Sequence, residues 1–243
     1  MADVSRETPP PPDPAVLAAL FPEERRALVE QYAALLASEG VLRGLIGPRE
    51  VARLWDRHLV NCALLAPLLP QDATVADLGS GAGLPGLVIA IARPDVRVTL
   101  IEPMERRTAF LVEAVERLGL DAVGVVRGRA EDWTLPERFD VVTARALAPL
   151  PKLLRWALPL VRPGGALLAM KGSSAAEEIA EAAAELGRAQ ATAEVLHPEV
   201  AGATSTTVVR VVPRASTTIG WPTGQSPRRS TRTGPRRGRK GPR

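Results

Sequence analysis

The spacing of apolar residues along the chain changes near Pro70. Over residues 15–69, apolar side chains recur every three or four positions, which is the spacing of amphipathic helices. Pro22 and the acids after it indicate the start of one helix, because both are favoured in a first turn. We expect this helix to end at Gly40 and a second helical segment to run from Pro48 to Pro70.

Beyond residue 72, short runs rich in β-branched residues alternate with helical stretches. The stretch 106–119 carries an apolar stripe and predicts a helix, and Gly164-Gly165 is expected to turn the chain into the fifth strand. The runs predicted to be strands are 75–78, 96–101, 122–126, 139–144, 165–170, 194–196 and 206–212. This alternation predicts an α/β fold with a mostly parallel sheet and helices on both faces. Such sheets bind ligands at the carboxyl ends of their strands.

Composition indicates a globular protein of a reducing compartment. The 243 residues are 46% apolar, enough for one medium-sized domain with an appendage. No run of about 18 apolar residues occurs and the N-terminus does not resemble a signal peptide, so we expect a cytoplasmic protein without a membrane span. Cys62 is the single cysteine and there are two histidines, so we expect neither an intramolecular disulfide nor a metal site.

The formal net charge of +4 hides an asymmetry. Residues 214–243 hold nine basic residues and no acidic one, which leaves 22 basic and 27 acidic residues in the rest of the chain. We expect a disordered leader at 1–13, a helical region at 14–70, a Rossmann-like domain at 71–213 and a disordered basic tail at 214–243. The tail is either a solvated end of an arginine-rich chain or a segment that attracts phosphates.

The segment VADLGSGAGLPG satisfies two nucleotide-loop patterns. Gly81, Gly83 and Gly86 have the G-x-G-x-x-G spacing of a dinucleotide fingerprint. Asp77, followed by three alternate glycines from Gly79, instead matches the first motif of class I S-adenosylmethionine methyltransferases. In both cases the glycines let the backbone approach the ligand, and the following helix directs amide donors at it.

Three features favour the methyltransferase interpretation. Asp77 complements a cationic amino-acid group better than a pyrophosphate. Glu102, which ends the second predicted strand, does not discriminate, because it can accept the ribose hydroxyls of either ligand, and a solvated strand-end acid is the alternative. After the third strand, Glu131, Asp132 and the backbone of Ala130 are candidates to meet an adenine amino group, and the first five strands follow the methyltransferase order.

The residues after the fourth predicted strand reduce the number of possible methyl acceptors. Amino methylation of adenine or cytosine uses an Asn/Asp-Pro-Pro-aromatic motif there, whereas this chain has Thr143-Ala144-Arg145-Ala146. Carbon-5 methylation needs a cysteine nucleophile, and Cys62 lies upstream, where we expect a small core residue. An acceptor that is already nucleophilic remains, such as N7 of guanine, which loses no proton and needs positioning more than a general base.

Two cations are expected at the mouth of the site. Arg145 ends the fourth predicted strand and is expected to fork onto a base edge or a phosphate. A structural ion pair of Arg145 with Asp140 or Glu131 is the alternative. Lys171 ends the fifth predicted strand at the same rim, where it either takes part in the site or is a solvated strand end.

Taken together, DLGSGAGLPGLVIAIA, IEPMERRTAFL, FDVVTARALAPL and GGALLAMKG resemble the bacterial ribosomal RNA small-subunit methyltransferase G family, also called glucose-inhibited division protein B. The upstream VLRGLIGPREVARLWDRHLVNCALLAPLLP is similar to the helical region of that family, with its Arg-His-Leu-x-Asn element. The likeness covers about residues 30–175. It implies transfer of a methyl group from S-adenosylmethionine to N7 of a guanine in 16S ribosomal RNA, either naked or in the small ribosomal subunit.

The resemblance also implies roles for residues. It places Gly79, Leu84, Ala130, Glu131 and Arg145 at the cofactor site, to which the loop and strand motifs add Asp77, Ser80, Gly81, Gly83 and Glu102. His58 matches the helical element near the pocket and joins Arg145 and Lys171 in the expected catalytic set. Without the resemblance, His58 is an ordinary histidine of a helical stripe, and Trp55 beside it is a core residue.

The expected RNA surface adds Arg127, Arg129 and the basic tail to this rim, although the two arginines alone are equally consistent with solvated loop charges. We expect a monomer. The chain departs from the family after its last predicted strand, because the basic tail is extra and Thr206 and Thr207 lead into the strand where a basic residue is expected. The C-terminal RNA contacts are therefore left open.

Three alternative functions remain on sequence grounds. A small-molecule methyltransferase calls for a closed, aromatic pocket, and only 3% of the residues are aromatic. A nicotinamide oxidoreductase binds NAD at the same glycine loop. A non-catalytic RNA- or ribosome-binding module binds the cofactor without turnover.

Overall fold

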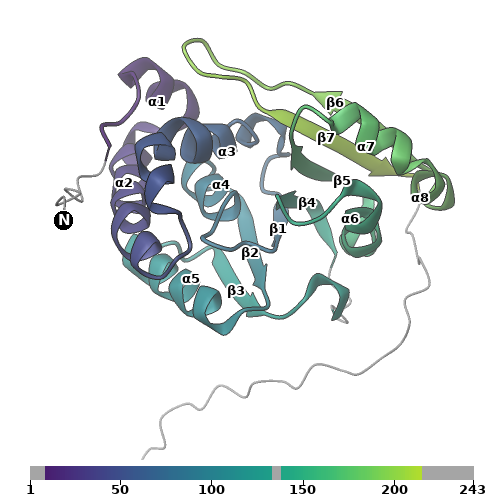
Figure 1. Cartoon of the computed structure of the whole chain (residues 1–243), viewed down its shortest axis with the longest axis horizontal. Helices are drawn as coiled ribbons and strands as arrows, with labels where there is room; N and C mark the ends of the chain where they lie inside the picture. The colour runs from purple at the N-terminus through teal and green to yellow at the C-terminus, as the bar shows by residue number, and fades with distance from the viewer. Residues whose placement is uncertain (1–8, 133–137, 215–243) are drawn as a thin grey trace, which may run out of the picture.

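A seven-stranded sheet forms the centre of the molecule in this computed structural model, which describes residues 9–132 and 138–214 (Figure 1). The strands are β1 (Thr74–Leu78), β2 (Arg97–Glu102), β3 (Val123–Arg127), β4 (Phe139–Arg145), β5 (Val161–Lys171), β6 (Ala191–Leu196) and β7 (Thr207–Pro213). They lie in the order β3-β2-β1-β4-β5-β7-β6. The five strands from β3 to β5 are parallel, and β7 runs antiparallel between β5 and β6. The predicted α/β class with a mostly parallel sheet is confirmed.

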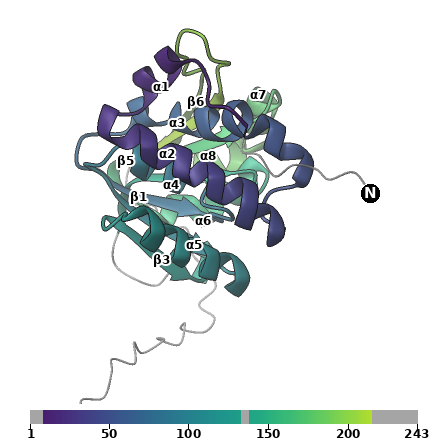
Figure 2. The same cartoon turned by 90° about the vertical axis from the view of Figure 1, so that its left-hand side faces the viewer.

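Helices cover both faces of the sheet (Figures 1 and 2). One face packs against α1 (Pro14–Leu20), α2 (Glu23–Leu35), the π-helical turns η1 (Leu36–Gly40) and η3 (Leu54–Val60), the 3-10 helices η2 (Pro48–Arg53) and η4 (Ala66–Leu68), α3 (Asn61–Ala63), α4 (Gly86–Ala92) and α5 (Glu105–Leu118). The other face packs against α6 (Leu150–Ala157), η6 (Leu158–Leu160), α7 (Ala175–Glu181) and α8 (Ala183–Arg188). The 3-10 turn η5 (Ala130–Asp132) follows β3.

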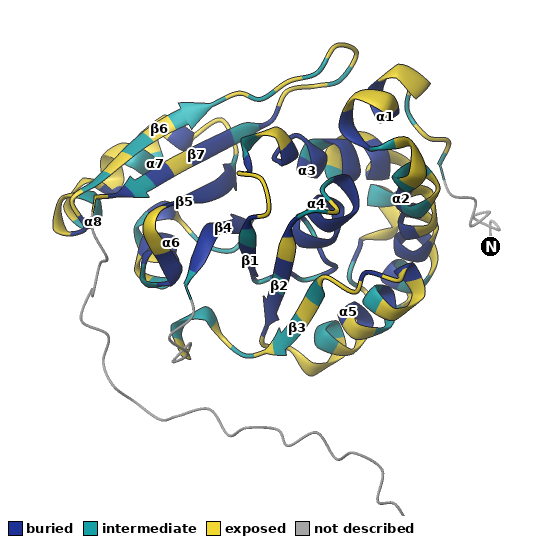
Figure 3. Cartoon of the chain, turned by 180° about the vertical axis from the view of Figure 1, so that it is seen from behind, coloured by how far each residue is buried: buried dark blue, intermediate teal, exposed yellow. Residues whose placement is uncertain are grey.

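Alternate residues of the central strands supply the two cores. Val75 of β1 belongs to the cluster with the N-terminal helices, whereas its neighbour Ala76 belongs to the cluster with α6. This is the period of two that a pleated strand imposes. Both faces of β1 and β4 are buried, as the dark strands of Figure 3 show, so polar residues such as Asp77 and Thr143 are buried among their apolar ones.

All seven predicted strands are present, and the largest difference is in β5. This strand begins at Val161 rather than 165, so the predicted glycine turn lies inside it. Its pairing with β4 shifts register between Phe139 and Val141, and Gly164 has φ +77°. A Cβ on Gly165 would lie 2.5 Å from the carbonyl oxygen of Asp140. The two glycines therefore do not form a turn before the strand, as predicted. They allow an irregularity within it.

Two helical predictions are corrected by the structure. The chain stays helical through Gly40 to Leu42, and Gly44, at φ +65°, is the glycine with the left-handed conformation. The second segment does begin at Pro48, but it consists of 3-10 and π-helical turns more than of one α-helix. No helix among the described residues is long and apolar enough to cross a membrane.

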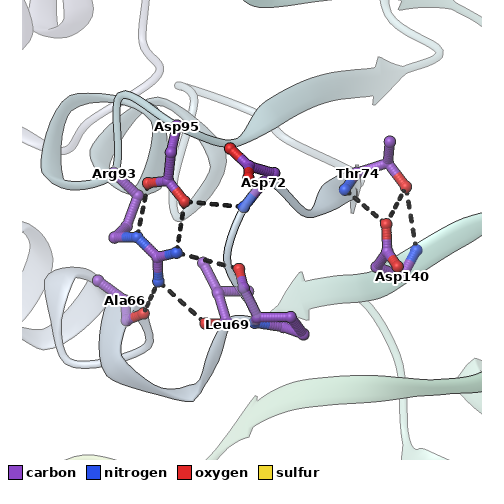
Figure 4. A network of polar contacts seen from close by, with 8 residues as sticks. Ala66, Leu69, Asp72, Thr74, Arg93, Asp95 and Asp140 are labelled. Carbon is purple, nitrogen blue, oxygen red and sulfur yellow. Dashed lines mark hydrogen bonds and ion pairs between the residues drawn. The ribbon is translucent and has the colours of Figure 1, made fainter.

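Arg93 fastens the N-terminal helical region to the sheet (Figure 4). Its guanidinium donates to the carbonyl oxygens of Ala66 at 2.8 Å and Leu69 at 3.0 Å, and it pairs with Asp95 at 2.6 Å. Asp95 in turn accepts from the backbone N–H of Asp72, two residues before β1. The entry to the first strand is thus fixed by hydrogen bonds to the preceding helical turns.

Candidate active site

The glycine loop connects β1 to α4 at the carboxyl edge of the sheet. Gly79, Gly81 and Gly83 all have positive φ, at +67°, +57° and +96°. A Cβ on Gly83 would collide with the Leu87 side chain and lie 2.9 Å from Oη of Tyr32. The Tyr32 hydroxyl, which is buried, donates to the carbonyl oxygen of Ala82 at 2.7 Å. Helix α2 therefore holds the loop from behind, and this role of Tyr32 was not predicted.

Asp77 lies fully buried near the end of β1, one residue before the strand ends at Leu78. Its Oδ2 accepts from the backbone N–H of Gly86 at 3.0 Å, and Ser80 Oγ donates to its carbonyl oxygen at 2.9 Å. Its Oδ1 is buried and has no hydrogen-bond partner in the described part of the chain. Burial raises the pKa of Asp77 to about 7, against the opposing effect of these hydrogen bonds. A cationic ligand group at Oδ1 would satisfy the orphan oxygen and favour the ionised form.

Glu102 ends β2 as predicted, but the alternative of a solvated acid is wrong. The side chain is 1% exposed, and its two oxygens accept from the backbone N–H groups of Gly81 at 2.9 Å and Met104 at 3.0 Å. Each carboxylate oxygen keeps a second lone pair for a ligand hydroxyl. The glycine loop and the end of β2 are therefore one structure, tied together by this carboxylate.

The segment after β3 joins the same edge. The N–H of Gly128 donates to the carbonyl oxygen of Glu102 at 3.2 Å, which brings η5, with Ala130 and Glu131, beside the end of β2. Glu131 pairs with Arg129 at 3.7 Å. Arg127 pairs with Glu105 at 3.0 Å, and both arginine side chains are more than half exposed. The structure thus gathers the predicted cofactor residues other than Arg145 at the ends of β1, β2 and β3, with Leu84 half-buried in the glycine loop.

Arg145 reaches from the end of β4 into the N-terminal helical region. Its Nη2 donates to Nδ1 of His58 at 3.0 Å and to the carbonyl oxygen of Arg57 at 3.0 Å, and Nη1 donates to Sγ of Cys62 at 3.4 Å. The alternative pairing with Asp140 or Glu131 is wrong. Asp140 is engaged instead by Thr74, 2.6 Å from its hydroxyl, and by Arg162 on β5.

His58 has partners on both ring nitrogens. Its Nε2 lies 3.0 Å from Oε2 of Glu50, and its Nδ1 accepts from Arg145. Burial, followed by the nearby Arg145 charge, lowers the pKa of His58, and Glu50 acts in the opposite direction. The ring is therefore neutral at pH 7 and is more than an ordinary stripe residue. Trp55, in contrast, is a core side chain as expected, 4% exposed.

Lys171 ends β5 as predicted, but it is not a solvated strand end. Its side chain is 9% exposed, and Nζ lies 2.7 Å from Oε2 of Glu178 on α7 and 2.8 Å from the carbonyl oxygen of Ala148. The same Glu178 oxygen accepts from the N–H of Leu150 at 2.8 Å. The ammonium and the carboxylate together hold the loop between β4 and α6.

A polar cavity of about 1000 Å³ opens beside Arg145 and Lys171. Its wall also includes Arg57 and Asn61 from the helical region and Thr206 at the start of β7. Thr206 is buried and donates to Oδ1 of Asn61 at 3.2 Å. The cavity therefore lies between parts of the chain that are far apart in sequence.

Comparison with known proteins identifies the family. The family model described as rRNA small subunit methyltransferase G matches residues 25–204. The chain belongs to this family. A Ribosomal RNA small subunit methyltransferase G from Nocardioides sp. is 60% identical, covering 90% of this chain and 88% of the relative. One from Thermobifida fusca is 55% identical, covering 86% of this chain and 88% of the relative.

Solved structures support the fold of this methyltransferase G chain. An O-methyltransferase from Bacillus cereus in complex with SAH superimposes with a TM-score of 0.54 at 18% identity, covering 81% of this chain and 94% of that chain. At that identity the likeness concerns the fold alone. The predicted class I methyltransferase fold is thus confirmed, and no group of three or more metal-ligating side chains occurs among the residues described.

Several residues of the methyltransferase G site escaped the sequence analysis. Glu50, Arg57 and Glu178 each contact a predicted site residue, and Asn61 and Thr206 line the cavity. The Arg-His-Leu-x-Asn element contains Arg57 and Asn61 and was the available signal for both. Glu50 and Glu178 lie in surface-like charged stretches, where the sequence alone predicts only solvated acids.

Proposed function

We propose that this chain transfers a methyl group from S-adenosylmethionine to N7 of a guanine in 16S ribosomal RNA. The observation that carries the proposal is the adjacency of two half-sites at one sheet edge. A glycine loop with the buried, half-partnered Asp77 stands on one side, and a polar cavity walled by Arg145 stands on the other. Family membership supplies the class of substrate, because the relatives carry the name of a small-subunit rRNA methyltransferase.

The residues present suit the cofactor. The orphan Oδ1 of Asp77 calls for a donor, which an amino-acid ammonium supplies, and Glu102 retains lone pairs for ribose hydroxyls. The residues that would hold the cofactor are Asp77, Gly79, Ser80, Gly81, Gly83, Leu84, Glu102, Ala130, Glu131 and Arg145. When bound, S-adenosylmethionine supplies an electrophilic methyl group on a sulfonium.

The protein's own task at the acceptor is positioning. N7 of guanine has a lone pair in the ring plane and loses no proton when it is methylated, so the site needs orientation and exclusion of water. Arg145 uses three of its five N–H groups on described residues, and two remain for O6 of guanine or a phosphate. Lys171, engaged by Glu178, acts by holding the cavity wall.

Cys62 supports this chemistry over carbon-5 methylation. It is fully buried, and burial raises the pKa of its thiol to about 11. A thiol in that state is a poor nucleophile at neutral pH. The described lining of the cavity also holds no aromatic residue, which disfavours a small-molecule acceptor stacked between rings.

For the partners, we propose the small ribosomal subunit or its RNA as substrate, and a cytoplasmic monomer as the working form. The acidic body and the basic residues of 214–243 favour contact with phosphates through the tail, most of which lies outside the described residues. Arg127 and Arg129, both exposed, are placed to extend such a surface.

A transfer assay tests the proposal. Purified chain is mixed with radiolabelled S-adenosylmethionine and small subunits, or naked 16S RNA, from cells that lack this protein, and labelled bases are mapped. Label on N7 of one guanine is expected. Label elsewhere would mean another acceptor, and cofactor binding by calorimetry without any label would favour the non-catalytic module.

A further inference from the structure

Three side chains from separate elements form one chain of hydrogen bonds behind the cavity. Glu50 of η2 is hydrogen-bonded to His58 of η3, and His58 is hydrogen-bonded to Arg145 at the end of β4, both at a distance of 3.0 Å. Glu50 also pairs with Arg57 at 3.4 Å, and the carbonyl of Arg57 accepts from Arg145. The guanidinium that faces the cavity is therefore held entirely from the helical region.

The roles of the two ring nitrogens follow from the partners. A guanidinium has only donors, so Nδ1 of His58 is the acceptor in its bond to Arg145. The ring proton is then on Nε2, where the carboxylate of Glu50 accepts it. A second proton on the ring would place an N–H against the N–H groups of Arg145 and set two like charges in contact.

We propose that Glu50 is a positioning residue for methyl transfer, because it holds His58 in the neutral tautomer that orients Arg145 toward the acceptor. This inference rests on the proposed function, in which Arg145 contacts the acceptor. It assigns a task to a residue that does not itself line the cavity.

The charges around the three residues make the arrangement sensitive to pH. The other titratable groups that interact with Glu50, His58 or Arg145 are Tyr32, Arg53, Arg57, Cys62 and Asp77. Burial and Arg145 lower the pKa of His58, and Glu50 opposes them. Methylation should therefore fall on the acid side as His58 gains a proton, with a midpoint below the ordinary histidine value of about 6.5.

Exposure separates positioning from stability. The Glu50 side chain is 33% exposed and that of His58 is 12% exposed, so removal of the carboxylate opens no cavity in the core. Because Glu50 is a third exposed, water can replace its carboxylate at Nε2 of His58, and the loss of such a partly solvated pair costs little free energy of unfolding. Substitution of Glu50 should thus change the kinetics while leaving the melting temperature close to that of the parent chain.

The experiment compares E50Q, E50A and H58Q with the full parent chain, and E194Q serves as control. Glu194 pairs with Arg210 in an exposed ion pair on the β6–β7 ribbon, away from the cavity. In E50Q the amide oxygen still accepts from Nε2, so the plateau rate should stay within about twofold of the parent. Its acid limb should move to lower pH, because the charge that raises the pKa of His58 is gone.

In E50A, loss of the acceptor should reduce kcat/KM about 10-fold to 100-fold, the scale of a misplaced catalytic group. At saturating S-adenosylmethionine, where the titration of Asp77 does not limit binding, H58Q should lose the acid limb that His58 causes. Equal rates and equal pH profiles in E50A and the parent chain would overturn the proposal. A loss of rate without any shift of the acid limb in E50Q would assign Glu50 a merely structural role.

A second readout does not depend on activity. The chain has two histidines, so a ¹⁵N spectrum of labelled histidine, compared with that of H58Q, assigns His58 directly. The parent chain should show a neutral ring with the proton on Nε2, and E50Q should titrate at lower pH. A proton on Nδ1 would overturn the inference. A correct tautomer in a chain that binds cofactor but transfers no methyl would instead count against the proposed function.

Discussion

At the scale of single residues, Asp77 is the group whose state depends most on a ligand. It is fully buried, it has one oxygen without a partner among the described residues, and its pKa is raised to about 7 by burial. A raised pKa means that the folded chain keeps a proton that the unfolded chain loses. Stability from this group is complete below the ordinary value of about 3.9 and is lost as pH rises through 7.

The affinity for S-adenosylmethionine should therefore rise with pH. The ammonium of the cofactor prefers an ionised Asp77, so binding should tighten between about pH 6 and pH 7.5 as the carboxyl loses its proton. D77N should bind more weakly and should lose this dependence. Calorimetry of cofactor binding at several pH values checks both, and an affinity of the parent chain that is flat over this range would contradict the assignment.

Substitution of Lys171 tests whether this residue, expected to be catalytic, contacts the substrate or only stabilises the wall of the cavity. K171M strands Glu178, which is mostly buried, and should lower the free energy of unfolding by about 2 kcal/mol. The double variant K171M/E178M should recover much of that loss, because no unpaired charge remains. Chemical denaturation measures both, with K152M on the surface of α6 as control. If the double variant is stable but inactive, Lys171 contacts the substrate directly.

At the scale of elements, the strands were predictable and the helical segments only partly so. Buried parallel strands are rich in β-branched and other apolar residues, and β1, β2 and β4 each contain a short run of this kind. In contrast, apolar periodicity does not distinguish an α-helix from the 3-10 and π-helical turns that follow Pro48. These turns bring His58 against Arg145 and Glu50 against His58.

The candidate site also has one part that the sequence predicts and one part that it does not. Asp77, the glycines and Glu102 belong to one short βαβ segment, so local spacing was enough to predict that they meet. The wall of the cavity depends on pairs such as Thr206 with Asn61, which are 145 positions apart. No local pattern encodes such a contact, and these residues were found only through the fold.

Helix α2 should influence cofactor binding through one hydroxyl. Y32F removes the buried bond to Ala82 and leaves its carbonyl oxygen unpaired, at a cost of about 1–2 kcal/mol in the free energy of unfolding. Cofactor affinity should fall as the glycine loop loosens. S38A provides the control, since it deletes an exposed hydroxyl bond in η1, the turn that follows α2 directly. Unchanged affinity in Y32F would show that the loop keeps its shape unaided.

At the scale of the whole molecule, the N-terminal helical region and the sheet share a single core. Every residue of α4 is buried, and its neighbours in that core include side chains of α2 and α3. A fragment of residues 71–214 would expose this apolar surface to water. The helical region is thus part of the folding unit, although its sequence rhythm sets it apart.

The fragment of residues 71–214 should therefore unfold without cooperativity and should bind no cofactor. A chain that begins at residue 9 should unfold cooperatively and should bind the cofactor. Circular dichroism during denaturation, with calorimetry of cofactor binding, compares the two. Cooperative unfolding of the shorter fragment would show that the helical region is a separate domain.

The shared wall of the cavity also sets an order on the synthesis of the protein. Every residue proposed to hold the cofactor, apart from Arg145, has been translated once Glu131 is made, and these residues lie on neighbouring strands. The wall of the acceptor cavity is complete only when Thr206 and Thr207 arrive and β7 inserts between β5 and β6. Most residues proposed to bind the methyl donor are thus encoded early in the chain, whereas the wall of the acceptor cavity is complete only near the end of translation.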